Sequence, residues 1–93
     1  MTTIDVACER AGEGWVCRVT VADETGRSEH RVHVSALDLE RLSPGAEDPD
    51  DVLRRSFEFL LEREPRTSIL SSFDLPVIGR YFPDYERTIV RNR

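Results

Sequence analysis

Apolar and polar residues alternate along three runs in the first third of the chain. The runs are Ile4–Cys8, Trp15–Val21 and His30–Val34, and Gly and Asp residues separate them. A period of two with one apolar face is typical of a half-buried β-strand. Residues 2–35 are therefore predicted to form a three-stranded antiparallel meander.

The apolar positions also predict the register, because a shift of one residue would turn every apolar side chain of a strand to the opposite face. A turn at Gly12 and Glu13 opposes Cys8 to Cys17, Val6 to Val19 and Ile4 to Val21. A four-residue loop at 24–27 would oppose Val19 to Val32 and Cys17 to Val34. All these side chains then share one face, which needs a cover from the second half of the chain.

The main cover is predicted to be a helix over residues 48–64. Asp48 suits the N-cap, the acids after it face the positive end of the helix dipole, and Pro65 stops the helix. Its apolar stripe consists of Leu53, Phe57, Leu60 and Leu61. Residues 36–47 form a connector with a short helix, for which Ser35 or Asp38 is the predicted cap.

Residues 65–90 are predicted to be a helical segment that prolines interrupt. Its beginning, 66–70, fits either a strand or a helical turn. Asp74 is the expected cap of the helix that follows, and Pro83 is expected to end that helix. The apolar residues Leu75, Ile78, Phe82, Tyr85 and Ile89 follow a 3-4-3-4 spacing, which indicates one helical face.

These elements predict an α+β fold in the order β-β-β-α-α-α. The meander is covered on one face by the amphipathic helix and the short C-terminal helices. The length of 93 residues predicts a single domain, 1–93, with a modest core.

Charge argues against nucleic acid as a partner, because the formal net charge is −5 and phosphate contacts need clustered positive charge. The alternative is local: Arg80 and Arg87 alternate with aromatic residues, which can stack on bases. All 13 basic residues are Arg, a bias that suggests a GC-rich bacterial genome. No segment is long enough to span a membrane and the first residues lack a leader pattern, so a cytoplasmic location is expected.

Motifs for catalysis, cofactors or metals are not found, and no catalytic residue, cofactor or metal is expected. Cys8 and Cys17 oppose each other at a separation that would allow a disulfide, but two free core thiols are favoured for a reducing compartment. His30 is predicted to face the core and His33 the opposite side. A small enzyme whose site combines these histidines with carboxylates across a dimer interface is kept as an alternative.

The order of elements over residues 3–64 resembles the first half of HicB-type antitoxins. In this chain three short strands precede an acid-capped amphipathic helix, Asp-Pro-Asp-Asp-Val-Leu-Arg-Arg-Ser-Phe-Glu-Phe-Leu-Leu-Glu. The resemblance implies a regulatory protein whose partial ribonuclease H-like sheet binds a protein partner, a toxin in that family, usually with a separate segment that binds nucleic acid. The aromatic-glycine strand motif and the Leu-Pro-Gly-Cys turn of that family are absent, so no residue role is transferred.

The aromatic residues near the C-terminus are the strongest candidates for a functional surface. Aromatic and Arg side chains are favoured in protein interfaces. The predicted contact residues are Arg80, Tyr81, Phe82, Tyr85, Arg87 and Ile89. We therefore expect a non-catalytic interaction module that forms a homodimer or binds a protein partner. The competing interpretation is that these residues complete the core of a single chain.

Overall fold

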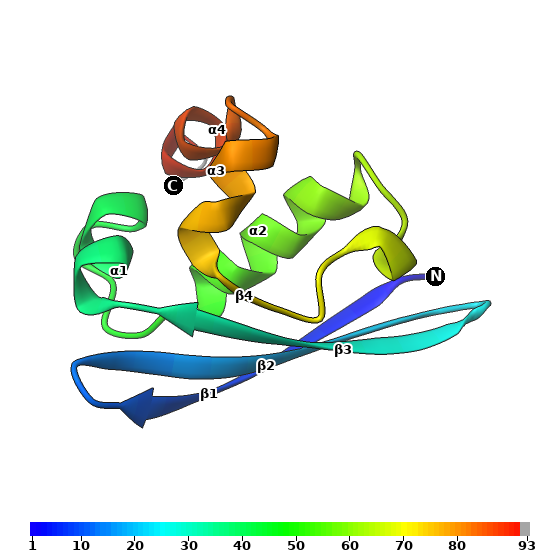
Figure 1. The fold of residues 1–93 in the computed structure, drawn as a ribbon, viewed down its shortest axis with the longest axis horizontal. Helices are drawn as coiled ribbons and strands as arrows, with labels where there is room; N and C mark the ends of the chain where they lie inside the picture. The colour runs from blue at the N-terminus through cyan, green and yellow to red at the C-terminus, as the bar shows by residue number, and fades with distance from the viewer. Residues whose placement is uncertain (92–93) are drawn as a thin grey trace.

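The computed structural model describes residues 1–91 and confirms the α+β class (Figure 1). In chain order the elements are β1 (Thr3–Ala11), β2 (Gly14–Asp23), β3 (Gly26–Val34), α1 (Ala36–Leu42), α2 (Asp50–Leu61), the 3₁₀ turn η1 (Arg66–Ser68), β4 (Ser72–Asp74), the 3₁₀ turn η2 (Leu75–Val77), α3 (Ile78–Tyr81) and α4 (Tyr85–Arg91).

The sheet has four strands in the order β1-β2-β3-β4, so the prediction of a three-stranded meander is wrong in its detail. The first three strands are antiparallel, and β4 pairs in parallel with β3, with Phe73 beside Val32. A main-chain hydrogen bond of 2.8 Å from Arg31 N–H to Ser71 O begins this pairing. Asp74, expected to cap a helix, ends this strand, and its side chain makes no capping bond to η2. Three residues are too few to show a strand period in a sequence.

The register of the first hairpin is as predicted, with Cys8 opposite Cys17 and Val6 opposite Val19. The second hairpin is shifted by two residues: Val19 faces His30 and not Val32. Its turn is shorter than the predicted four-residue loop, because Asp23 and Gly26 already pair. The Asp23 carboxylate accepts hydrogen bonds from both N–H and Oγ1 of Thr25, at 2.8 and 2.7 Å, and closes this turn.

The predicted cap of α1 is confirmed, whereas α2 begins at Asp50 with Pro49 and not Asp48 at its N-cap. Ser35 and Asp38 form a reciprocal capping box on α1. The Asp48 carboxylate accepts a hydrogen bond of 3.1 Å from Asp50 N–H at the start of α2. The last turn of α2 ends at Leu61, before the predicted end at Glu64.

Helices α1, α2, α3 and α4 lie on the same side of the sheet, and no element of the described residues covers its other side (Figure 1). The buried side chains come from alternate positions of β2 and β3, from the inner faces of the helices and from the segment after α2. They include Val19, Val21, Val32, Leu42, Leu53, Phe57, Leu60, Leu75, Ile78, Tyr85 and Ile89. Inward side chains of β1 are only partly buried, because β1 lies at the edge of the sheet.

Candidate interaction surface

The predicted contact residues divide into a buried set and an exposed set. Tyr85 and Ile89 are 0% and 1% exposed and belong to the core. Tyr81 is 66% exposed. Arg80 and Arg87 are exposed and Phe82 is partly buried. The competing interpretation thus holds for Tyr85 and Ile89, which offer no surface to a partner in this fold.

Tyr85 fastens α4 to α2 through a buried hydrogen-bond chain. The Ser56 hydroxyl donates to the main-chain oxygen of Val52 at 2.6 Å, and it lies 2.7 Å from the Tyr85 hydroxyl. Since the single hydroxyl hydrogen of Ser56 is used on Val52, the Tyr85 hydroxyl is the donor to Ser56. Burial raises the pKa of Tyr85 well above its usual value. The ring of Phe59 meets the Tyr85 ring edge-on at 5.4 Å.

Tyr81 and Phe82 line a groove that the sequence did not reveal as a unit. The groove has a volume of 320 Å³ and lies between the end of α2, the segment 66–73 and α3. Its lining is Leu60, Glu64, Ser68, Ile69, Leu70, Phe73, Val77, Ile78, Tyr81 and Phe82, and we call this set the 60–82 groove. Only Glu64 and Ser68 in this set have polar side chains apart from the Tyr81 hydroxyl.

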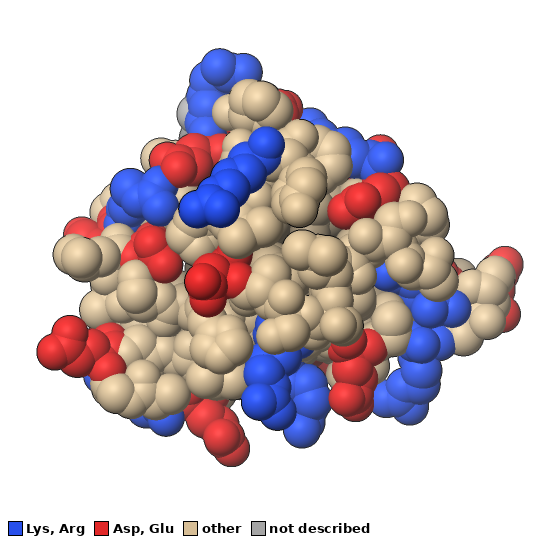
Figure 2. All heavy atoms as spheres, in the orientation of Figure 1, with Lys and Arg blue, Asp and Glu red and all other residues tan. Residues whose placement is uncertain are grey.

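The edges of the 60–82 groove carry exposed apolar side chains. Leu70 is 46% exposed and Tyr81 is 66% exposed. Uncharged atoms cover the middle of the face shown in Figure 2, over α3 and the segment after α2, and charged side chains surround them. Sequence reasoning missed Leu70 and Val77 because neither lies next to the aromatic cluster in the sequence. The run of apolar residues in the segment 69–78 was their only signal.

The two histidines are not brought together. His30 is 3% exposed, and its ring bonds on both sides: Nδ1 is 2.8 Å from the Leu70 main-chain oxygen and Nε2 is 2.9 Å from Ser28 Oγ. The Leu70 carbonyl only accepts, so Nδ1 carries the hydrogen. His33 lies on the open side of the sheet, with Nδ1 3.8 Å from an Asp74 carboxylate oxygen. Each histidine has a structural partner, and the single chain does not join them in one site.

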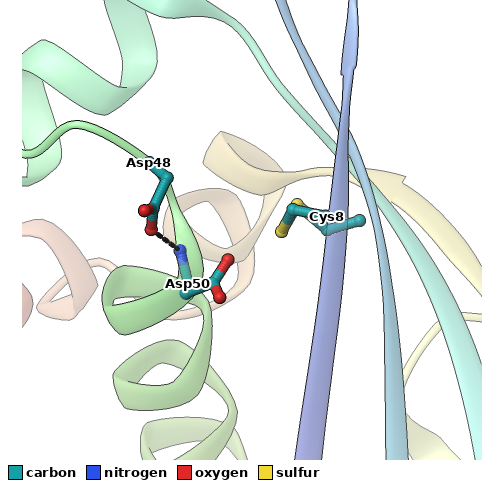
Figure 3. Close-up of a disulfide and its surroundings, with 4 residues drawn as sticks. Cys8, Asp48 and Asp50 are labelled. Carbon is teal, nitrogen blue, oxygen red and sulfur yellow. Dashed lines mark hydrogen bonds between the residues drawn. A yellow bond between two sulfur atoms is a disulfide. The ribbon is translucent and has the colours of Figure 1, made fainter.

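Cys8 and Cys17 form a disulfide, so the preference for free thiols was wrong. The two residues are directly opposed on β1 and β2, with Cα atoms 4.0 Å apart. Figure 3 shows the Cys8 sulfur beside the start of α2, where the Asp50 carboxylate points toward it. The bond joins the outermost strand covalently to the middle of the sheet.

No helix within residues 1–91 combines the length and the apolar character needed to cross a bilayer. Comparison of the chain with protein-family models, with curated proteins and with solved structures finds no match.

Proposed function

We propose that this chain is a small protein-interaction module without catalytic activity, and that the 60–82 groove receives an apolar segment of a protein partner. The observation that carries the proposal is the apolar groove with Leu70 and Tyr81 exposed at its edges. Exposed aromatic and aliphatic side chains around a concave apolar surface are typical of recognition sites. A volume of 320 Å³ is near the lower limit of ligand sites, about 300–1,000 Å³, which suits one or two anchoring side chains.

The charge of the groove suggests the chemistry of the partner. Glu64 is the charged residue of the lining, and Ser68 offers a hydroxyl beside it. A partner segment with an aliphatic or aromatic anchor, flanked by Lys or Arg, would complement this end of the groove. The acidic net charge of −5 favours the same kind of partner.

A peptide-display selection tests this proposal. Random peptides would be selected on the wild-type protein and rescreened on Tyr81→Asp, with Leu37→Asp as the matched control. Leu37 is 82% exposed on α1 and does not line the groove, so its change alters surface charge equally. We expect peptides with an apolar anchor and a basic flank that bind the wild type and the Leu37 variant, and bind the Tyr81 variant at least tenfold more weakly. If the recovered peptides bind all three proteins alike, the groove is not a recognition site.

The disulfide bears on the proposed location of the module. Disulfides persist in oxidising compartments and are rare in the cytoplasm. The Cys8–Cys17 bond therefore argues against the cytoplasmic location expected from the sequence. Intact mass after rapid alkylation of free thiols in cells would decide the matter, because only the reduced protein gains two alkyl groups.

Self-association is the second part of the proposed function. Of the contact residues predicted for self-association, Tyr85 and Ile89 are buried in the core and cannot contact a second copy. The surface that the sheet offers for this purpose is the free edge of β1.

A further inference from the structure

β1 is a long edge strand whose protection is limited to its charged residues Asp5, Glu9 and Arg10 and to one contact from Arg54. It pairs with β2 through nine consecutive residue pairs without a bulge. Its sequence, Thr-Ile-Asp-Val-Ala-Cys-Glu-Arg-Ala, has no Pro, Gly or Lys. Natural proteins cover, shorten, twist or charge their edge strands, because the free N–H and C=O groups pair readily with another strand. An edge of this kind is a docking surface for a strand.

The disulfide identifies which main-chain groups of β1 are free. Cα atoms 4.0 Å apart place Cys8 and Cys17 in a non-hydrogen-bonded pair of the antiparallel ladder. The N–H and C=O of Cys8 therefore point away from β2, and by alternation so do those of Ile4, Val6 and Arg10. A hydrogen bond from the Arg54 side chain to Ile4 O agrees with this assignment.

Arg54 protects only the beginning of the edge. Among the hydrogen bonds of the described residues, none reaches the outward groups of Val6, Cys8 or Arg10. The arrowhead of β1 lies at the lower margin of the molecule in Figure 1, and none of the described elements is drawn below it. The free stretch thus runs from Val6 to Arg10.

We propose that β1 pairs in antiparallel orientation with β1 of a second copy of this chain, about a two-fold axis at Cys8. Cys8 would pair with Cys8 of the partner subunit, and Val6 would pair with Arg10 of the partner subunit. This register satisfies the free main-chain groups of Val6, Cys8 and Arg10 in both copies, and it leaves Arg54 on Ile4. The two sheets become one continuous sheet.

Charge selects this register over its neighbours. An axis at Ala7 would place Asp5 opposite Glu9 of the partner subunit, and like charges in opposed positions are destabilising. An axis at Val6 would direct Cys8 N–H of the partner subunit to the Ile4 oxygen that Arg54 occupies. With the axis at Cys8, Glu9 faces Ala7 of the partner subunit, and within the paired strands no acid of β1 faces another acid.

The same geometry favours a second copy over an unrelated strand. Ile4, Val6 and Cys8 are only partly buried in one chain, although they pack against its core. A second β1 with the same alternation of faces would place its apolar side chains beside them. The inference gives a geometry to the self-association part of the proposed function and does not depend on what occupies the 60–82 groove.

Opposite charges at position 7 test the inference. In the dimer this position faces Glu9 of the partner subunit, while within one chain it faces Arg18. Ala7→Glu should therefore leave the single chain folded and raise the dimer Kd by about 2- to 30-fold, because the repulsive pair occurs twice. Ala7→Lys should keep or lower the Kd. Sedimentation equilibrium from 1 to 300 µM (roughly the range over which such weak dimers dissociate) measures both. A wild type that stays monomeric overturns the proposal, and so does the reverse order of the two variants.

A crosslinking experiment tests the register. Opposed residues of a hydrogen-bonded pair have Cα atoms about 5.5 Å apart, within the range of a disulfide. In Cys17→Ser, the Cys8 thiols of two copies should exchange with oxidised glutathione, which takes up the two electrons and two protons, and form a covalent dimer. Cys8→Ser leaves the buried Cys17 thiol and should not form one. Equal crosslinking of both variants would refute the register.

The dimer and the groove can be tested apart. Tyr81→Asp should weaken peptide binding at least tenfold and leave the dimer Kd unchanged, whereas Ala7→Glu should raise the dimer Kd and leave peptide binding unchanged. If Tyr81→Asp dissociates the dimer while Ala7→Glu does not, self-association belongs to the groove and the inference about β1 fails.

Discussion

Replacing Ser56 by Ala is expected to destabilise the protein more than replacing Tyr85 by Phe, although both changes break the same hydrogen bond. Both residues are 0% exposed. Ser56→Ala leaves the Tyr85 hydroxyl buried without its acceptor, which costs about 1–3 kcal/mol. Tyr85→Phe leaves Ser56 bonded to the Val52 oxygen at 2.6 Å, so about 0.5–1.5 kcal/mol is expected.

The double variant Ser56→Ala/Tyr85→Phe should be more stable than Ser56→Ala alone. It removes the hydroxyl that the single change leaves without a partner, and replacing both partners by apolar groups is often nearly neutral. The expected coupling energy lies within about 0.5–3 kcal/mol. Urea unfolding, followed by the fluorescence of Trp15 and by circular dichroism, measures the free energy of unfolding of each variant. Additive effects of the two single changes, or a larger loss of stability in Tyr85→Phe than in Ser56→Ala, would show that no such hydrogen bond couples the two residues.

The same pair predicts how stability depends on pH in alkaline solution. Burial raises the pKa of Tyr85 in the folded chain, whereas an unfolded tyrosine ionises near its ordinary value of 10.0. The contribution of Tyr85 to the free energy of unfolding is complete below pH 10.0. Above this pH the free energy of unfolding falls by about 1.4 kcal/mol per pH unit. Tyr85→Phe should remove this slope. Tyr81→Phe, a change on the surface, should keep it.

Three further predictions concern the disulfide and the side-chain contacts that stabilise the sheet. Reduction of the Cys8–Cys17 bond, which closes a loop with a sequence separation of 9, should lower the free energy of unfolding by about 2–3 kcal/mol, measured by urea unfolding with and without a phosphine reductant. Arg66→Met should lower the free energy of unfolding by about 1–3 kcal/mol in the same assay, because the nearly buried guanidinium lies 3.3 Å from Asp23 and connects η1 to the β2–β3 turn. An unchanged value would show that the contact contributes nothing. Hydrogen bonds from the Thr25 side chain and main chain, assisted by Arg66, lower the pKa of Asp23 from 3.8 to about 2. The contribution of Asp23 to stability is therefore complete above pH 3.8 and is lost as the pH falls through about 2. Asp23→Asn should therefore flatten the acid side of the stability profile, and a profile like that of the wild type would contradict this.

The first hairpin could be predicted in full because its turn and its alternation specify the same register. The alternation of apolar residues excludes every register in which the apolar side chains of the two strands lie on opposite faces, which is half of them. Gly12 marks the position of the turn and so selects one of the remaining registers. In the second hairpin, the same alternation allows a shift of two residues, because such a shift moves no side chain to the other face. The Asp23–Thr25 hydrogen bonds, which the alternation does not report, select a shorter turn and place His30 opposite Val19.

β4 could not be predicted because it is a strand only through its neighbour. Its three residues pair with residues 31–33 of β3, which lie far away in the sequence, and local sequence carries no signal for such a partner. The same is true of the Leu70 oxygen, which receives the His30 ring. Both features depend on how α2 packs on the sheet, because this packing positions the segment that follows α2.

The candidate surface was partly predictable from helical spacing. The 3-4-3-4 series that includes Ile78, Tyr85 and Ile89 marks buried positions, although α3 and α4 are separate helices. Tyr81 lies outside this series and is exposed. The spacing could therefore have separated Tyr81 from Tyr85. It could not show that Leu70 lines the same groove as Tyr81, because that depends on tertiary packing.

The parallel pairing of β4 has a consequence for the order of folding. The hairpins join residues close in sequence, whereas the contact of Val32 with Phe73 requires closure of a long loop that contains α1 and α2. Such a short, non-local strand should form late and open early, as a local unit of low stability. Leu70 and Phe73, which line the 60–82 groove, belong to this unit. Amide hydrogen exchange should therefore be faster at Phe73 than in the centre of β2, and a partner that fills the groove should slow it.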